Sequence, residues 1–163
     1  MNRLRRSDSS RMVATAAARV RNMLASHRLE VAVPAGLPAI RVDPVLFEQV
    51  LFNLLDNAAK YAPPDTTISI RGARDRDSIA LQIMDEGSGI PPTELESVFD
   101  KFYRVQKGDH VRPGTGLGLA ISRGFVEAMQ GTISAANRGD RSGAILTIRL
   151  PVPARTHALD TAA

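Results

Sequence analysis

Three short stretches of this sequence carry residue types that bind ligands rather than fill a core. The first, "GTGLGLAIS" at 114–122, places glycines directly ahead of a predicted helix. Bare backbone N–H groups and the positive end of a helix dipole make such a segment a site for anions, phosphate above all. No strand precedes these glycines and no Gly-Lys-Ser/Thr ending follows, so neither the dinucleotide fingerprint nor the P-loop explains them.

The second stretch is an amide-bearing stripe on a helix predicted over 44–61. Gln49, Asn53, Asn57 and Lys60 fall on one side of that helix. Asparagine is a mediocre helix former, so two asparagines one turn apart need a reason. Their side-chain oxygens are ligands that Mg²⁺ accepts beside water and phosphate oxygens. Solvated or capping asparagines are the alternative, and the stripe alone does not separate the two.

The third stretch is "MDEGSGIPP" at 84–92. Asp85 ends an apolar strand, and Gly87 and Gly89 allow a tight turn and a close approach to a flat ligand. A carboxylate in this position can accept a hydrogen bond from an exocyclic amine. A plain turn is the alternative, because Asp and Gly populate turns freely.

A long polar loop, residues 100–114, precedes the glycine-rich stretch. Its cations are Lys101, Arg104, Lys107 and Arg112. A loop of this length without a periodic pattern is usually functional, so we expect a lid over the anion site; a solvated surface loop is the alternative.

The elements that position these residues follow from periodicity and turn signals. Helices are predicted at 12–26, 44–61, 91–98 and 115–129, and strands at 29–33, 67–73, 78–85, 132–137 and 144–150. Helices mixed with antiparallel hairpins predict an α/β two-layer sandwich, with the helices on one face of a mixed, mostly antiparallel sheet.

Composition limits the class of protein. A chain of 163 residues with 44% apolar residues fits one compact domain. The net charge of +4 is too small to argue for nucleic acid, and the absence of cysteine excludes disulfides and thiolate metal sites. No apolar run is long enough for a membrane span, so we expect a cytoplasmic location.

The motifs come in the order found in sensor histidine kinases. "EQVLFNLLDNAAKYAP" resembles their N box, "DEGSGIP" their G1 box, "FDKFYR" their F box and "GTGLGLAIS" their G2 box. The resemblance covers about residues 28–152 and is closest to potassium-responsive Kdp-type sensor kinases. It implies the Bergerat ATP-binding sandwich with an ATP lid.

The resemblance also implies roles around ATP and Mg²⁺. Asn57 would bind Mg²⁺, aided by Asn53, and the catalytic positions would be Asn53, Lys60 and Arg112. Lys60, Lys107 and Arg112 would approach the phosphates. The remaining positions implied to bind the nucleotide are Tyr61, Asp85, Gly87, Gly89 and Ile90 around the base, and Gly114, Thr115, Gly116, Leu117, Gly118 and Leu119 along the phosphates.

One difference from related ATPases and one departure from the family pattern bear on activity. Asn53 stands where related gyrase and Hsp90-like ATPases carry a water-activating glutamate, so slow hydrolysis is expected. Ala144 stands where the family often has Gly-Ser/Thr near the adenine. Asn53 thus favours phosphotransfer to a protein group over rapid hydrolysis.

The phospho-acceptor must come from another domain, because the three histidines, His27, His110 and His157, lack the acceptor context. We therefore expect residues 1–27 to be a linker or the remnant of a preceding helical domain, 28–152 the catalytic domain and 153–163 a disordered tail. The resemblance implies an inner-membrane parent sensor, a histidine-bearing dimerisation domain and a response regulator receiver domain as partners, no nucleic acid, and a monomeric fragment. An anti-sigma-type serine kinase and a non-catalytic nucleotide-sensing module remain alternatives.

Overall fold

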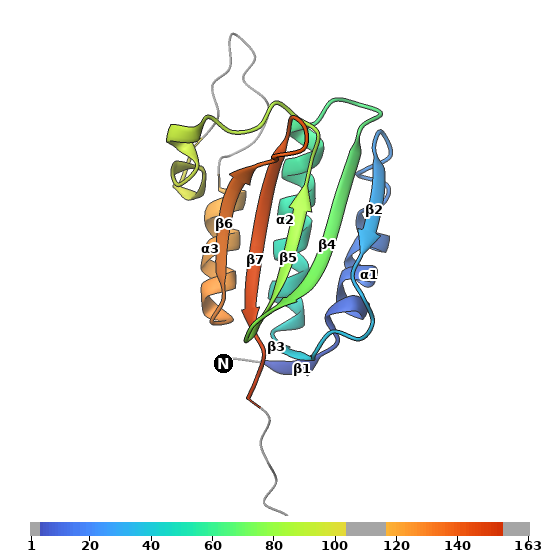
Figure 1. Ribbon diagram of the computed structural model, residues 1–163, viewed down its shortest axis with the longest axis vertical. Coiled ribbons are helices and arrows are strands. Elements are labelled where there is room, and N and C mark those ends of the chain that lie inside the picture. Colours follow the sequence, from blue (N-terminus) through green and yellow to red (C-terminus); the bar gives the residue numbers. More distant parts are fainter. Residues whose placement is uncertain (1–3, 104–116, 155–163) are drawn as a thin grey trace, which may run out of the picture.

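One five-stranded sheet forms the frame of the molecule (Figure 1). The computed structural model describes residues 4–103 and 117–154. In spatial order the strands are β2 (Arg28–Ala32), β4 (Thr67–Asp75), β5 (Ser78–Met84), β7 (Ala144–Pro151) and β6 (Thr132–Asn137). The β2–β4 pair is parallel and the other three pairs are antiparallel. The prediction of a mixed, mostly antiparallel sheet is confirmed.

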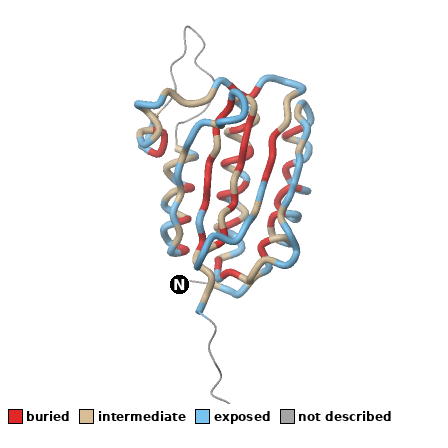
Figure 2. Tube along the Cα trace, in the orientation of Figure 1, coloured by how far each residue is buried: buried red, intermediate tan, exposed pale blue. Residues whose placement is uncertain are grey.

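Three α-helices lie together on one face of this sheet (Figure 1). They are α1 (Ser9–Val20), α2 (Pro44–Tyr61) and α3 (Gly118–Ala128). The buried residues, red along the trace in Figure 2, come from both the helices and the sheet strands and form one hydrophobic core cluster. The two-layer α/β sandwich predicted from the sequence is therefore the observed fold class.

Helix α2 is defined at both ends by local chemistry. The Asp43 side chain caps the helix by accepting from the N–H groups of Val45 at 2.9 Å and Leu46 at 3.4 Å, and Pro44 occupies the first position. Pro63 follows shortly after the last turn, where a proline cannot continue the helix. The apolar face is fully buried or nearly so at Phe47, Val50, Leu51, Leu54, Leu55 and Ala58.

The first helix starts and ends earlier than predicted. Asp8 caps it by accepting from the N–H groups of Ser10 at 2.9 Å and Arg11 at 3.4 Å, so it begins at Ser9 rather than residue 12, and it ends at Val20 rather than 26. Two three-residue strands, β1 (Arg5–Ser7) and β3 (Ile40–Val42), pair in a separate small sheet. They were not predicted, because three residues are too few to show a strand period.

The predicted helix at 91–98 is wrong. Two short 3₁₀ turns, η1 (Pro92–Glu94) and η2 (Ser97–Phe99), replace it. Pro92 disfavours the helical conformation at Pro91, whose ψ is 131°, and the run that follows is too short for an α-helix. The helix predicted from 115 is described from Gly118. Most of the predicted lid, and the tail beyond 154, lie outside the described residues.

The N-terminal segment packs into the main core. Val13, Val20 and Leu24 are at most 3% exposed and belong to the same cluster as the α2 and sheet residues. The linker assignment of residues 1–27 stays a prediction, although these described residues contribute to the folded unit. Within the described ranges, no helix combines the length and apolarity needed to cross a bilayer.

We predict that Leu24→Ala lowers the free energy of unfolding by about 3 kcal/mol, because it removes a buried side chain and leaves a cavity. Urea unfolding measures the change. The exposed neighbour Arg21 provides the control, and Arg21→Ala should stay within about 0.5 kcal/mol of wild type. Equal stability of the two variants would show that the N-terminal segment is not part of the cooperative unit.

Candidate functional site

The three ligand-binding signals converge at one end of the sheet. The C-terminal end of α2, the end of β5, the β6–β7 turn and the start of α3 all lie at the upper end in Figure 1. Two approaches tie them together. The Asn53 amide of α2 reaches the carbonyl of Gly118 at the start of α3. A Cβ built on Gly87 would lie 2.7 Å from the carbonyl oxygen of Tyr61 at the end of α2.

Asp85 is a buried carboxylate at the end of β5, with 7% of its surface exposed. Its Oδ1 accepts from the backbone N–H of Gly87 at 2.8 Å and of Ala144 at 3.2 Å. No described residue donates to its Oδ2. Burial raises the pKa of Asp85 above the ordinary value, and the bonds from Gly87 and Ala144 and the charge of Arg138 oppose that rise. The site thus holds a carboxylate with one oxygen fixed and one available.

Ala144 contacts this carboxylate through its backbone. A main-chain N–H does not depend on the side chain, so the departure from the family's Gly-Ser/Thr at this position leaves the Asp85 bond intact.

Glycine is required at two positions of the turn after β5. A Cβ on Gly87 would crowd the Tyr61 carbonyl, and Gly89 has a φ of +78°, with a built Cβ 2.7 Å from Oδ1 of Asn137. Side chains would therefore displace the segment from α2 and from the β6–β7 turn. The tight turn predicted from "DEGSG" is observed, and the close approaches made here are to the protein's own backbone and side chains.

The β6–β7 turn holds this segment from the other side, which sequence reasoning did not predict. Asn137 forms two hydrogen bonds of 2.7 Å with the backbone of Ile90: Nδ2 donates to the carbonyl and Oδ1 accepts from the N–H. Ser142 donates to the carbonyl of Gly87 at 2.6 Å. Gly143 has a φ of +145°, and a Cβ there would lie 2.0 Å from the Asp85 carbonyl.

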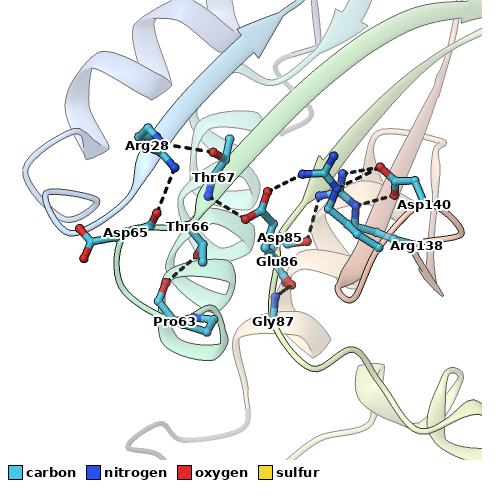
Figure 3. A network of polar contacts seen from close by, with 11 residues as sticks. Arg28, Pro63, Asp65, Thr66, Thr67, Asp85, Glu86, Gly87, Arg138 and Asp140 are labelled. Atoms are coloured by element: carbon cyan, nitrogen blue, oxygen red, sulfur yellow. Dashed lines mark hydrogen bonds and ion pairs between the residues drawn. The ribbon is translucent and has the colours of Figure 1, made fainter.

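Arg138 adds a further contact between the β6–β7 turn and the Asp85 segment, as Figure 3 shows. Its side chain is 6% exposed; Nη1 donates to the Asp85 carbonyl at 3.1 Å, and Nε and Nη2 each bond Asp140 at 3.0 Å. Nearby, Arg141 pairs with Glu86 at 3.0 Å. The sequence of this turn is that of an ordinary polar hairpin loop. The one feature that could have indicated its contacts is an asparagine at the end of a strand.

Asn53 links α2 to α3. Its Nδ2 donates to the Gly118 carbonyl at 3.4 Å and to Ser122 Oγ at 3.3 Å, while its Oδ1 accepts from Gln49 at 2.9 Å. Ser122 is fully buried. Glu48, on another side of α2, forms an ion pair with Arg19 of α1.

Asn57, Lys60 and Tyr61 complete the α2 edge. The amide of Asn57 has no hydrogen-bond partner within the part of the chain that the structure describes, and the residue is half-buried. Lys60 pairs with Asp56 at 2.8 Å and remains partly exposed. Tyr61 is half-buried and lies against the Gly87 turn through its backbone.

The phosphate-binding candidates are described in part. Leu117 and Leu119 are half-buried, and Gly118 is exposed, with nothing within 4 Å of a built Cβ. Lys107, Arg112, Gly114, Thr115 and Gly116 lie outside the described residues. The start of α3 therefore borders the site, while the roles of all the residues named in this paragraph stay predictions.

Residues 42–154 match the family described as histidine kinase-, DNA gyrase B- and HSP90-like ATPases. The match covers more than half of the chain, and the chain belongs to this family.

The relatives that match most of this chain include sensor kinases. The sensor protein KdpD of Clostridium acetobutylicum is 38% identical over 141 residues, which cover 86% of this chain and 16% of the relative. KdpD of Escherichia coli K12 is 43% identical over 126 residues, covering 77% and 14%. The solved structure of the mycobacterial sensor histidine kinase MprB matches with a TM-score of 0.77 at 30% identity, covering 91% of this chain and 97% of that one. The resemblance to sensor histidine kinase catalytic domains is confirmed, and the two alternative functions are not favoured.

We predict that Asp85→Asn raises the free energy of unfolding at neutral pH. Burial raises the folded-state pKa of Asp85 above its ordinary value of 3.8, so ionisation costs stability as the pH rises through the folded pKa. Asparagine removes that charge and keeps an oxygen acceptor. Urea unfolding should show the gain at neutral pH and lose it below pH 3.8. A variant that is less stable than wild type at neutral pH would contradict a net cost of the charge.

Proposed function

We propose that this chain binds Mg-ATP at the end of its sheet and transfers the γ-phosphate to a histidine on a separate dimerisation domain. The observation that carries the proposal is the convergence of Asp85, the α2 amides and the start of α3. Asp85 offers Oδ2 to the adenine amine, which is the one donor that separates adenine from a base without an amine. Membership of an ATPase family supports the nucleotide.

The donor set of α2 fits Mg²⁺. No cluster of three His, Cys, Asp or Glu within the described ranges would hold a metal alone. Amide oxygens together with the nucleotide's phosphates make a ligand set that Mg²⁺ accepts. The Asn57 amide, which has no hydrogen-bond partner among the described residues, would be the main protein ligand of the ion. The Asn53 oxygen already accepts from Gln49, so Asn53 would have an auxiliary role in holding the ion. When bound, the ion neutralises phosphate charge during transfer.

Catalysis in this proposal is positioning rather than proton abstraction. Asn53 cannot serve as a general base, and its two hydrogen bonds to Gly118 and Ser122 tie α2 to α3 and so would fix the two walls of the phosphate site. Lys60, with Lys107 and Arg112 from the predicted lid, would approach the phosphates. The attacking nitrogen is supplied by the acceptor histidine.

The whole-protein setting belongs to the same proposal. The chain spans 16% and 14% of the two KdpD relatives, so the parent sensor would supply the acceptor histidine. We propose a response regulator receiver domain as the next phosphate acceptor, a potassium-responsive membrane sensor as the parent, and a cytoplasmic position for this domain.

We predict that Asn57→Ala reduces Mg-ATP affinity at least about tenfold, since it removes a metal ligand. Titration calorimetry with and without Mg²⁺ measures this, and the loss should disappear when Mg²⁺ is omitted. Val45→Ala, at the exposed start of the same helix, is the control with near-normal affinity. An equal loss for Asn57→Ala in both conditions would remove the metal assignment.

Transfer is tested by mixing the purified chain and γ-labelled ATP with a separately purified histidine-bearing helical domain of the parent sensor. The expected product is an acid-labile label on the histidine domain, absent when its histidine is replaced. Acid-stable label on serine would favour the serine-kinase alternative, and binding of ATP without transfer would favour a sensing module.

A further inference from the structure

Two adjacent residues at the end of β6 hold the two ends of the segment from Asp85 to Ile90. Asn137 pairs with both backbone groups of Ile90 at 2.7 Å. Arg138 donates to the backbone carbonyl of Asp85 at 3.1 Å. The strand register of β5 ends at Met84, and one further backbone bond, from the Asp85 N–H to the Ala144 carbonyl at 3.1 Å, links the segment to β7. The Asn137 and Arg138 side chains add to that bond at the two ends of the segment.

The Arg138 contact is built to persist. Its guanidinium is nearly buried, and Asp140 takes two of its N–H groups at 3.0 Å each. The hydrogen bonds from Arg138 lower the pKa of Asp140 to about 2. The pair therefore stays ionised at any pH at which Asp85 could lose its proton.

The Asn137 contact depends on an unusual backbone. Gly89 adopts a φ of +78°, and its position leaves no room for a Cβ beside the Asn137 oxygen. Without the two Asn137 bonds, Gly89 would be free to take other conformations, because glycine has few steric limits. The backbone that carries Asp85 and Gly87 is thus held at both ends of the segment.

We propose that Asn137 and Arg138 are positioning residues that hold the Asp85–Ile90 segment in its adenine-binding geometry. This inference rests on the proposed nucleotide function. A purely structural role for the β6–β7 turn would weaken folding, or binding of every nucleotide alike. A positioning role weakens the recognition of the adenine amine specifically.

The first test compares ATP with purine riboside triphosphate, which lacks the exocyclic amine, by titration calorimetry with Mg²⁺. Wild type should prefer ATP. Asn137→Ala should bind ATP about tenfold more weakly and lose most of the preference, as expected for the loss of two hydrogen bonds. Asn137→Asp, which keeps the acceptor for the Ile90 N–H, should recover part of it.

Each outcome of this first test has one meaning. A full preference for ATP in Asn137→Ala would overturn the inference, as would equal losses for both nucleotides. A wild type that binds neither nucleotide, or that shows no preference, would instead overturn the proposed function or the base role of Asp85.

The second test uses the pH dependence of ATP binding. The charged groups around Asp85 are Arg138 and Asp140 on the β6–β7 turn, with Glu86 and Arg141 beside them. The ionised Asp85 carboxylate is a stronger acceptor for the amine than the protonated acid, so ATP affinity should fall on acidification. Arg138→Gln removes a positive charge that lowers the pKa of Asp85, and the fall should therefore begin at higher pH.

Arg141→Ala is the matched control, because Arg141 is on the same turn and pairs with half-buried Glu86 and exposed Asp140 instead of the Asp85 backbone. It should keep the wild-type profile, and Arg138→Lys should lie between. An unchanged midpoint in a folded Arg138→Gln protein would overturn the role of Arg138. Thermal unfolding checks folding, and if Arg138→Gln does not fold, the Asn137 variants decide.

Discussion

The structure depends on placing one carboxylate, Asp85, at the end of an apolar central strand. Burying a charge is costly unless hydrogen bonds compensate for the lost water. Backbone N–H groups of Gly87 and Ala144 supply that compensation to one oxygen, while the other oxygen receives no bond from a described residue. The turn after β5 must therefore fold back tightly enough to bring Gly87 to Asp85, and β7 must begin beside it.

Helix α2 meets a second constraint because it serves the core and the site at once. Its apolar face is buried against the sheet, which fixes the rotation of the helix. That rotation turns Asn53 toward α3 and leaves the Asn57 amide without a protein partner among the described residues. Core packing thereby positions the polar edge, so the geometry of the site follows from the hydrophobic pattern of the helix.

The β6–β7 turn joins these parts into one unit. In Figure 3, Arg138 lies between the Asp85 turn and Asp140, and the neighbouring Glu86 reaches Thr67 on β4. Contacts from a chain segment some fifty residues away thus hold the turn after β5, as the Asn137–Ile90 pair shows. The family match and the structural match to MprB show that sensor histidine kinases share this fold.

The sequence by itself determined the fold class, most of the elements and the motif order. Long amphipathic segments such as α2 and the 67–84 hairpin repeat their pattern often enough to be recognised, and local caps such as Asp43 mark their starts. Three-residue strands and the proline-rich 91–98 stretch lack that repetition, so β1 and β3 were missed and a helix was predicted wrongly. Only the tertiary structure decided that Asn137 and Arg138 form hydrogen bonds with the backbone of the Asp85 turn. Their partners lie far away in sequence, and a hydrogen bond between distant segments produces no periodic pattern in the local sequence from which it could be predicted.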